Sequence, residues 1–342
     1  MKPLFLNFML FIYLTLCITK IRTMEYVNSG GYKMPVLGLG TYTVTQEEEL
    51  TNAINKALEI GYRHIDTAAV YRNEHIIGKV LNEWISSGKV KREDLFITTK
   101  LGRFDFFPDQ VEKALNTSLQ KLQLDYVDLY LAHFPVATKL NDQNKEVVQP
   151  TDIISVWKKL EEQVTTGKTR TIGLSNFNIS QIQRIQKIAK IQPANLQVEI
   201  HPYFQQKELR DFAKTNNITV TAYSPLGAPG LNKYFKESNK PEITLPDILN
   251  DETVTKIAAS HKKSPAQVVL RFLIQLDLII IPKSTNPKRL ADNFDVFDFT
   301  LNDEEIKSLE KLDKGKKAKI FNMQYLADHI VDHPEYPFHE NI

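Results

Sequence analysis

A repeated alternation of short apolar runs with amphipathic stretches constrains this chain more than any other feature. Eight runs have the character of β-strands: VLGLGTY, RHIDTA, LFITTKL, YVDLYLAH, TIGLS, NLQVEI, TVTAYS and LIIIPKS. Most are continuously apolar rather than alternating, which is typical of strands covered on both faces. Helical patterns separate them, and eight strand–helix repeats predict an α/β fold of the (β/α)8 TIM barrel type.

Residues that start and stop helices support this division. The stretch TQEEELTNAINKALEIG has a capping box of Thr45 and Glu48 and stops at Gly61. A second helix is expected to begin with Pro108, and a third to carry Pro265 in its first turn. The pattern therefore predicts helices on the outside of the barrel.

The segments at the two ends of the barrel region have separate roles in this prediction. YVNSGGYKM indicates a β-hairpin around Ser29, Gly30 and Gly31 that closes the barrel floor. The segment Lys314–His333 is expected to form a C-terminal loop that shapes substrate specificity. No low-complexity linker divides the chain, so residues 24–342 are expected to form one domain.

A Rossmann fold is the competing α/β interpretation. GLGTYT supplies Gly38 and Gly40, but Thr43 stands where the third glycine of a dinucleotide-binding fingerprint should be. A partial motif does not outweigh eight strand–helix repeats, so the sequence favours the barrel.

Charge and cysteine content exclude several classes of protein. The 43 basic and 41 acidic residues give a net charge of +2, which argues against binding nucleic acid or a membrane surface through bulk charge. One cysteine and scattered histidines offer no metal site. A small-molecule substrate and a monomeric protein are expected.

The first residues resemble a secretory signal. An apolar run from Leu4 to Ile18 follows Lys2, is too short for a comfortable membrane span, and predicts a signal peptide over residues 1–19. The alternative is a start at Met24 and a cytoplasmic enzyme. We expect a secreted protein. Three acceptor sequons for N-glycosylation are present, at Asn116, Asn178 and Asn217.

Polar residues fall at the ends of nearly all the predicted strands. In strand order they are Asp66, Lys100, His133, Ser175 with Asn176, Gln197 with Glu199, Tyr223 and Lys283. The carboxyl ends of barrel strands carry the catalytic groups in enzymes of this fold. Burying so many polar groups without partners would be costly, so the pattern predicts an active site at this end.

Three of these residues form a chemically coherent set with Tyr71, which lies in the loop after the second strand. Tyr71 is a poor acid at its ordinary pKa, but Lys100 beside it favours the phenolate, and Asp66 can hold the lysine in place. His133 can orient or polarise a carbonyl oxygen. Such a set could deliver a proton to a carbonyl as hydride arrives from a cofactor.

At these residues the sequence resembles the aldo-keto reductase family, over Met24 to Ile342. The blocks that carry the resemblance are MPVLGLGT, GYRHIDTAAVYRNE, TTKL, LDYVDLYLAHFP, GLSNFN, QVEIHPY, AYSPLG, IPKSTNPKRLADNF and YPFHE, in the family's order. The resemblance implies that Asp66, Tyr71, Lys100 and His133 are a catalytic tetrad with Tyr71 as general acid.

The resemblance also implies an NADPH site. Tyr223 would stack on the nicotinamide, and Ser175, Asn176 and Gln197 would hold its carboxamide. Ser224 and Leu226 would lie along the pyrophosphate. Lys283, Ser284 and Arg289 would hold the 2′-phosphate, with Asn293 near the adenine.

The chain departs from the family's best-known reductases of small aldehydes around the substrate. The resemblance places Tyr42, Val70, Gly102 and Phe134 there, and several of these replace tryptophans. Gly102 in particular is expected to open the pocket, and Gly230 replaces an acid that helps latch the cofactor loop. Bulky ketones are therefore expected as substrates, as for the insect enzymes that reduce 3-dehydroecdysteroids, which this chain resembles.

Two functions remain to be compared. The first is an NADPH-dependent carbonyl reductase, and the second is a catalytically idle binding or structural protein on the same barrel, because fold alone does not settle function. The complete tetrad favours the enzyme.

Overall fold

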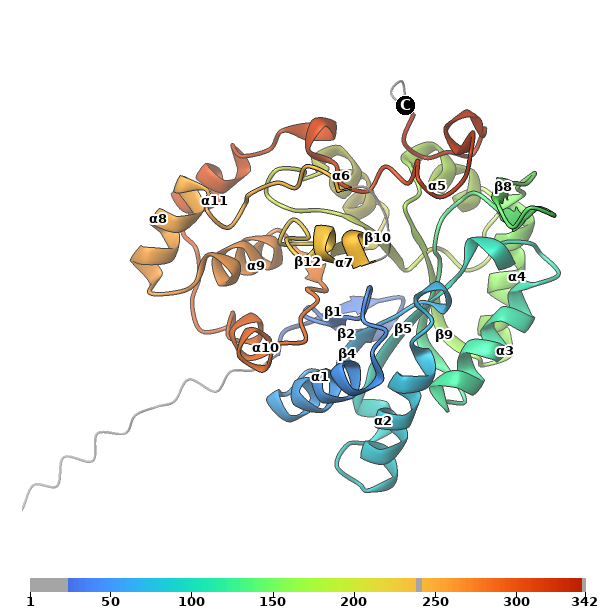
Figure 1. The fold of residues 1–342 in the computed structure, drawn as a ribbon, viewed down its shortest axis with the longest axis horizontal. Coiled ribbons are helices and arrows are strands. Elements are labelled where there is room, and N and C mark those ends of the chain that lie inside the picture. Colours follow the sequence, from blue (N-terminus) through green and yellow to red (C-terminus); the bar gives the residue numbers. More distant parts are fainter. Residues whose placement is uncertain (1–23, 238–241, 340–342) are drawn as a thin grey trace, which may run out of the picture.

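The computed structural model describes residues 24–237 and 242–339, and its main feature is one sheet of eight parallel strands (Figure 1). In spatial order the strands are β3 (Leu39–Gly40), β4 (His64–Asp66), β5 (Phe96–Leu101), β6 (Val127–Ala132), β9 (Thr169–Ser175), β10 (Asn195–Glu199), β11 (Thr219–Tyr223) and β12 (Leu278–Ile280). Each coincides with one of the eight predicted runs. The strand predictions are confirmed.

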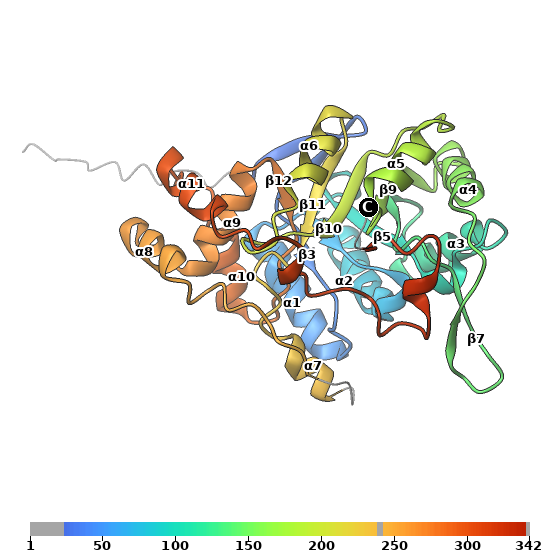
Figure 2. The ribbon, with the colours of Figure 1, turned by 90° about the horizontal axis from the view of Figure 1, so that it is seen from above.

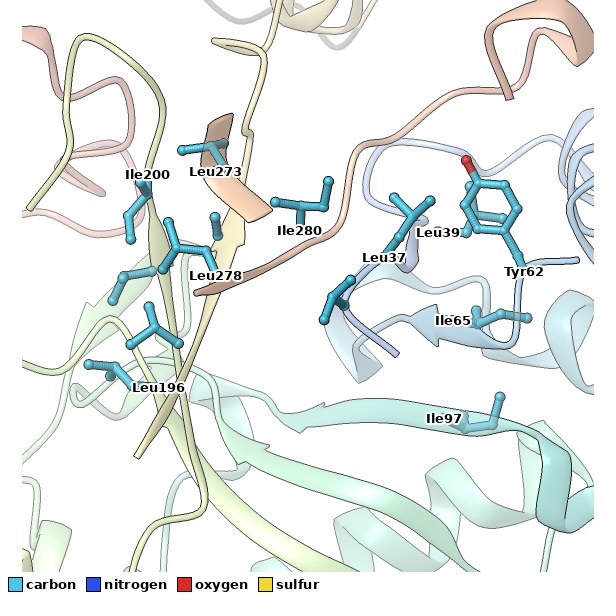
Figure 3. Close-up of a cluster of buried hydrophobic side chains, with 14 of the residues drawn as sticks. Leu37, Leu39, Tyr62, Ile65, Ile97, Leu196, Ile200, Leu273, Leu278 and Ile280 are labelled. Atoms are coloured by element: carbon cyan, nitrogen blue, oxygen red, sulfur yellow. The ribbon is translucent and has the colours of Figure 1, made fainter. Parts of the chain in front are cut away.

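Backbone pairing between the first and last strand regions closes the sheet. Leu37 and Ile280 form a parallel bridge, the N–H of Gly38 donates to the carbonyl of Ile280 at 2.8 Å, and the N–H of Ile280 donates to Val36 at 2.8 Å. Figure 3 shows Leu37 and Ile280 within one cluster of buried apolar side chains. The sheet is therefore a (β/α)8 barrel without a free edge.

Helices surround the barrel and bury their apolar faces against it (Figure 1). Eight of them follow the strands: α1 (Glu47–Ile60), α2 (Glu74–Ser86), α3 (Val111–Leu122), α4 (Ile153–Thr165), α5 (Ile179–Gln186), α6 (Lys207–Thr215), α9 (Pro265–Gln275) and α10 (Pro287–Phe294). Three more are α7 (Leu231–Glu237), α8 (Glu252–His261) and α11 (Asp303–Glu310). Leu273 of α9 packs beside Leu278 of β12, as Figure 3 shows.

Two predicted helix starts are wrong. Helix α1 begins at Glu47 after Gln46, and no side chain caps it, so Thr45 and Glu48 do not form a capping box. Its first turn instead carries three acidic residues, which favour the positive end of the helix dipole. Helix α3 begins at Val111, because the residues after Pro108 first form a turn. The start at Pro265 and the stop at Gly61 are confirmed.

The predicted hairpin lies at the barrel floor. It consists of β1 (Tyr26–Ser29) and β2 (Tyr32–Pro35), joined through Gly30 and Gly31, both at positive φ. A Cβ built at Gly30 would lie only 2.7 Å from Thr171, so the turn must approach the barrel without a side chain. Met34 of β2 is fully buried in an apolar cluster with Phe96, Leu129, Leu131 and Ile279.

The opposite end of the barrel, its mouth, is covered by irregular structure. A second hairpin of β7 (Thr138–Leu140) and β8 (Glu146–Val148), helix α7 and the C-terminal segment (residues 314–339) all lie on this side, whereas the β1–β2 hairpin lies on the other (Figure 2). Within the described ranges, we find no helix with the length and apolarity needed to cross a bilayer. The predicted leader, residues 1–19, and the rest of the first 23 residues lie outside the described part.

Candidate active site

An ion pair between Asp66 and Lys100 lies at the centre of the mouth. Asp66 ends β4, Lys100 lies on the neighbouring strand β5, and their side chains are almost completely buried. Lys100 Nζ donates to Asp66 Oδ1 at 2.6 Å and to the Thr67 carbonyl at 2.7 Å. Burial raises the pKa of Asp66 and lowers the pKa of Lys100, while their mutual attraction opposes both shifts.

Gln197 joins this pair from the other side of the barrel. It lies on β10, and its Nε2 donates to Asp66 Oδ2 at 2.7 Å. The resemblance implies that Gln197 also faces the carboxamide of the cofactor, and in the structure its own amide nitrogen holds the second carboxylate oxygen of Asp66. The carboxylate is thus fixed from two strands, which leaves it one orientation.

Tyr71 stands above the pair, at the end of the short 3-10 helix Ala69–Tyr71. Lys100 Nζ lies 5.1 Å from the centroid of its ring. Burial, followed by the negative charge of Asp66, raises the pKa of Tyr71 well above its ordinary value. Burial therefore keeps Tyr71 in its protonated form at neutral pH.

His133 completes the predicted set of four. It follows β6 directly, and its ring stands edge-on to Tyr71 with the centroids 5.7 Å apart. Burial, then the charges of Lys100 and Arg103, lower the pKa of His133 well below its ordinary value. A neutral imidazole beside a protonated phenol can donate or accept a hydrogen bond without adding charge.

A polar pair lies on the side of the mouth formed by β9 and β11. Tyr223 donates its hydroxyl proton to Asn176 Oδ1 at 2.8 Å, and Asn176 Nδ2 donates to the His133 carbonyl at 3.0 Å. Asn176 adopts a positive φ directly after Ser175, whose hydroxyl accepts from the same amide nitrogen at 3.1 Å. The structure thus brings Ser175, Asn176 and Tyr223 together, as the sequence predicted.

A basic group lies at the start of α10. Arg289 Nε donates to Ser284 Oγ at 3.4 Å, and Asn286 caps the helix by accepting from the Arg289 N–H. Burial, opposed by Glu49 but assisted by the charge of Arg289, lowers the pKa of Lys283. An anionic group placed between these cations would relieve their repulsion, so the residues present fit a phosphate.

The remaining cofactor candidates flank this region. Ser224 adopts a positive φ directly after β11, and Leu226 is partly buried against the main core. Asn293 is buried on α10, on the same helix as Arg289. These positions run from the end of β11 to α10, which is the order that an extended dinucleotide would require.

The predicted substrate residues do not form one group. Tyr42 packs on Tyr71 with the ring centroids 5.1 Å apart. A Cβ built at Gly102 would lie 2.8 Å from Val70 Cγ1, so Val70 fills the space that the absence of a side chain leaves. The expectation that Gly102 itself opens the pocket is corrected accordingly. Phe134 packs instead in a cluster with Val136, Ala327, Ile330 and Tyr336.

Sequence reasoning missed aromatic residues from distant segments. Phe321, in the C-terminal segment, packs edge-on against Tyr223 at 5.7 Å and lies 6.5 Å from Tyr42, centroid to centroid. Tyr234 of α7 lies 5.9 Å from Tyr42. The segment Lys314–His333 was expected to shape specificity, but the sequence around Phe321 has no periodicity and no motif, so nothing singled out this residue.

Two other predictions concern sites outside the mouth. Among the residues that the structure describes, no group of three histidine, cysteine or acidic side chains could hold a metal. Of the three sequons, Asn116 and Asn217 are exposed, whereas the side chain of Asn178 caps α5 by accepting from the Gln181 N–H.

Comparison with known proteins gives consistent matches. A model of the aldo/keto reductase family matches residues 36–314. Aldo-keto reductase family 1 member A1 of Mus musculus is 41% identical over 328 residues, covering 91% of this chain and 96% of that protein. Two solved structures are similar as well. The aldose reductase from Schistosoma japonicum has a TM-score of 0.83 and 40% identity, covering 93% of this chain and 100% of its own. A Bombyx mori aldo-keto reductase in complex with NADP has a TM-score of 0.80 and 37% identity, covering 92% and 99%.

Proposed function

The chain belongs to the aldo/keto reductase family and is an NADP-dependent oxidoreductase that reduces carbonyl groups, and on that premise we propose that Tyr71 is its proton donor. The observation that carries the proposal is the packing of Tyr71 against both Lys100 and His133, above the buried Asp66–Lys100 pair. A phenol held in this way presents a single acidic hydrogen to the mouth.

The cofactor, when bound, supplies a hydride to the carbonyl carbon. The residues of the chain then have to deliver one proton to the carbonyl oxygen, so that a ketone or aldehyde becomes an alcohol. Tyr71 keeps that proton because burial raises its pKa. As negative charge develops on the substrate oxygen, the O–H bond of Tyr71 breaks toward it, and the ammonium of Lys100 stabilises the phenolate that remains. Solvent later returns the proton.

His133 and Asp66 support this transfer in different ways. His133 is neutral, so it can orient the carbonyl oxygen by a hydrogen bond without competing as an acid. Asp66, held by Gln197, keeps Lys100 in place beneath the phenol.

We assign the basic group near α10 to the 2′-phosphate of NADPH. Lys283 and Arg289 would bind that phosphate, with Ser284 between them and Asn293 at the adenine. Tyr223 would stack on the nicotinamide, Ser175, Asn176 and Gln197 would face its carboxamide, and Ser224 and Leu226 would follow the pyrophosphate. Residues that bind in this order would hold the nicotinamide at the mouth, where it could supply hydride to the carbonyl carbon of a substrate whose oxygen faces Tyr71.

For the substrate we propose bulky ketones, 3-dehydroecdysteroids among them, alongside aromatic aldehydes. Tyr42 packs on Tyr71, and Phe321 faces Tyr42. The two tryptophans of the chain, Trp84 and Trp157, are buried in the main core instead. Gly102→Trp would have to displace Val70, so it should raise the KM for a steroid ketone before that for an aromatic aldehyde. Equal KM changes for both substrates would argue against this assignment.

The test of the proton donor is Tyr71→Phe, followed by stopped-flow NADPH oxidation with steroids, sugars and aromatic aldehydes. Turnover should fall by about two to four orders of magnitude, the range for losing a general acid. The control is Tyr130→Phe, since Tyr130 is also a buried phenol and its hydroxyl bonds no described residue. Near-normal turnover in Tyr71→Phe would refute the assignment, and an inactive wild type would favour the binding or structural protein.

We also propose that the enzyme is monomeric and secreted after cleavage of residues 1–19. The apolar run Leu4–Ile18 supports export. N-terminal sequencing of the native protein should find a start near Lys20, and a start at Met1 or Met24 would contradict secretion. Size-exclusion chromatography with light scattering tests the monomer.

A further inference from the structure

The carboxylate of Glu199 is buried at the mouth but takes no part in the chemistry proposed above. It ends β10 beside Tyr223 of β11, and the structure leaves it no exposed surface. Its Oε1 accepts from the Ile320 N–H at 2.6 Å, and its Oε2 accepts from the Phe321 N–H at 2.8 Å. One side chain thus takes up two consecutive backbone donors of the C-terminal segment.

The surroundings keep this carboxylate ionised. Burial alone would raise the pKa of Glu199, but the hydrogen bond from His201, the charge of Lys319 and the Ile320 N–H together bring it below its ordinary value. His201 Nε2 lies 3.2 Å from Oε1, and Lys319 Nζ lies 3.8 Å from Oε2. Hydrogen bonds to an ionised acceptor are the strong kind, so the segment is firmly held.

Phe321, one of the two residues held by Glu199, packs against aromatic rings of the proposed active site. Phe321 is 5% exposed, and its ring packs edge-on against Tyr223. The same ring faces Tyr42, which in turn packs on Tyr71. Displacing the backbone at residue 321 would therefore move the side of the pocket nearest the proposed proton donor.

We propose that Glu199 is a positioning residue: by binding the backbone of Ile320 and Phe321, it fixes the C-terminal segment so that Phe321 forms the substrate-facing wall beside Tyr223 and Tyr42. Glu199 acts through Phe321 and touches neither proton nor hydride. The inference rests on the proposed function, because that wall bounds the site where a carbonyl would be reduced.

Glu199→Gln tests the hydrogen bonds without relying on catalysis. It removes the charge and one of the two acceptor oxygens, so amide hydrogen exchange at Ile320 and Phe321 should accelerate about ten- to a hundredfold. The matched control is Glu161→Gln. Glu161 of α4 is also buried and accepts two consecutive backbone N–H groups, those of Lys190 and Ile191. Unchanged exchange at residues 320 and 321 in Glu199→Gln would overturn the proposal.

Steady-state kinetics test the consequence for the pocket. Glu199→Gln should raise the KM for a steroid ketone about tenfold and change kcat much less, because the tetrad keeps its contacts. Phe321→Ala should produce the same change, and the double variant should be no worse than Phe321→Ala alone. Glu161→Gln should leave the KM unchanged.

The outcomes separate the two proposals. A wild-type enzyme that reduces no carbonyl would refute the proposed function, and the exchange measurement would still decide whether Glu199 holds the segment. Additive effects of the two substitutions, an equal rise in KM for Glu161→Gln, or a fall in kcat alone would overturn the positioning role. If Glu199→Gln does not fold, Phe321→Ala still tests the wall, and an unchanged KM in that variant would refute it.

Discussion

Charged side chains are buried at both the floor and the mouth of the barrel, but the two ends differ in how well partners balance the buried charges. At the floor, Asp128 at the start of β6 is bound from three sides. Arg92 and the Ile97 N–H donate to its Oδ2 at 2.8 and 2.9 Å, and Arg170 donates to its Oδ1 at 2.8 Å. Both guanidinium groups also stack on the ring of Tyr126. The negative charge is balanced within the fold.

At the mouth, the charges of Asp66, Lys100 and Lys283 are buried although burial disfavours their charged forms. The pKa of Asp66 is raised and the pKa of Lys100 is lowered, both by burial, and Lys283 is crowded by Arg289. A fold selected for stability alone would not place them there, since buried pairs often cost more than they return. The difference indicates that charge at the floor stabilises the barrel, whereas charge at the mouth serves binding and catalysis.

Of the substitutions considered at the floor and the mouth, Lys100→Met should have the largest effect on activity. We expect turnover to fall by about a hundredfold or more, because nothing then stabilises the Tyr71 phenolate. Stability should suffer less than at the floor, since Asp66 can take up a proton and keep its bond from Gln197. Rapid-quench turnover and urea unfolding measure the two effects. Unchanged turnover would remove Lys100 from the mechanism.

Asp128→Asn should have the reverse profile. It breaks the bonds to two arginines that remain charged, so the free energy of unfolding should fall by about 3 kcal/mol. Turnover of the folded enzyme should stay within about twofold, because the carboxylate of Asp128 binds Arg92, Ile97 and Arg170, none of which belongs to the proposed catalytic set. Chemical denaturation with parallel kinetics checks this. A large loss of turnover without a loss of stability would contradict the comparison.

Lys283→Met tests the proposed contact between Lys283 and the 2′-phosphate of NADPH. The dissociation constant for NADPH should rise about ten- to a hundredfold, the value of one charge-assisted hydrogen bond, while that for NADH should barely change. Fluorescence quenching gives both constants. Lys288→Met is the control, because Lys288 lies five residues from Lys283, is exposed on α10 and pairs with Asp292. Equal losses for the two cofactors would exclude a 2′-phosphate contact.

A pH dependence of stability is also expected at Lys319. Burial, opposed by Glu199, lowers the pKa of Lys319 from 10.5 to about 8. Between these values the unfolded chain binds a proton that the folded chain does not, so this lysine's contribution to stability rises with pH. Relative to Lys319→Met, the wild type should therefore gain stability from pH 8 to 10.5. Asp128→Asn should show no such trend, because arginines stay charged. A constant difference for Lys319→Met would contradict the shift.

The sequence could predict the strands and most of the mouth for a physical reason. Parallel strands end at one edge, so polar residues such as Asp66, Lys100 and Tyr223 must converge if the strands are correctly placed. The hairpin was equally accessible, because two consecutive glycines at positive φ leave few alternatives. Local patterns were sufficient wherever geometry follows from secondary structure alone.

Other structural details depend on tertiary contacts with residues that the local sequence pattern does not reveal. Glu199 binds backbone N–H groups of the C-terminal segment, and a backbone donor is the same in every sequence. The size of the pocket at Gly102 is decided by Val70, which reaches into the space from another loop. The start of α1 was misplaced because Thr45 and Glu48 match a capping box, whereas the N-cap residue is Gln46, one residue later. Such details require the tertiary contacts themselves.

The seam between Leu37 and Ile280 joins the beginning of the barrel to its end and has a consequence for how the molecule is made. A ribosome releases the chain from one end, so β3 waits for its last neighbour until nearly all the other strands exist. Throughout that interval the growing sheet has two open edges, which are templates for pairing with another chain. The residues assigned to the 2′-phosphate follow β12 directly. Closure of the barrel and completion of the proposed cofactor site are therefore one late event in biosynthesis. A nascent chain cannot bind its cofactor before the two open edges of its sheet have paired with each other.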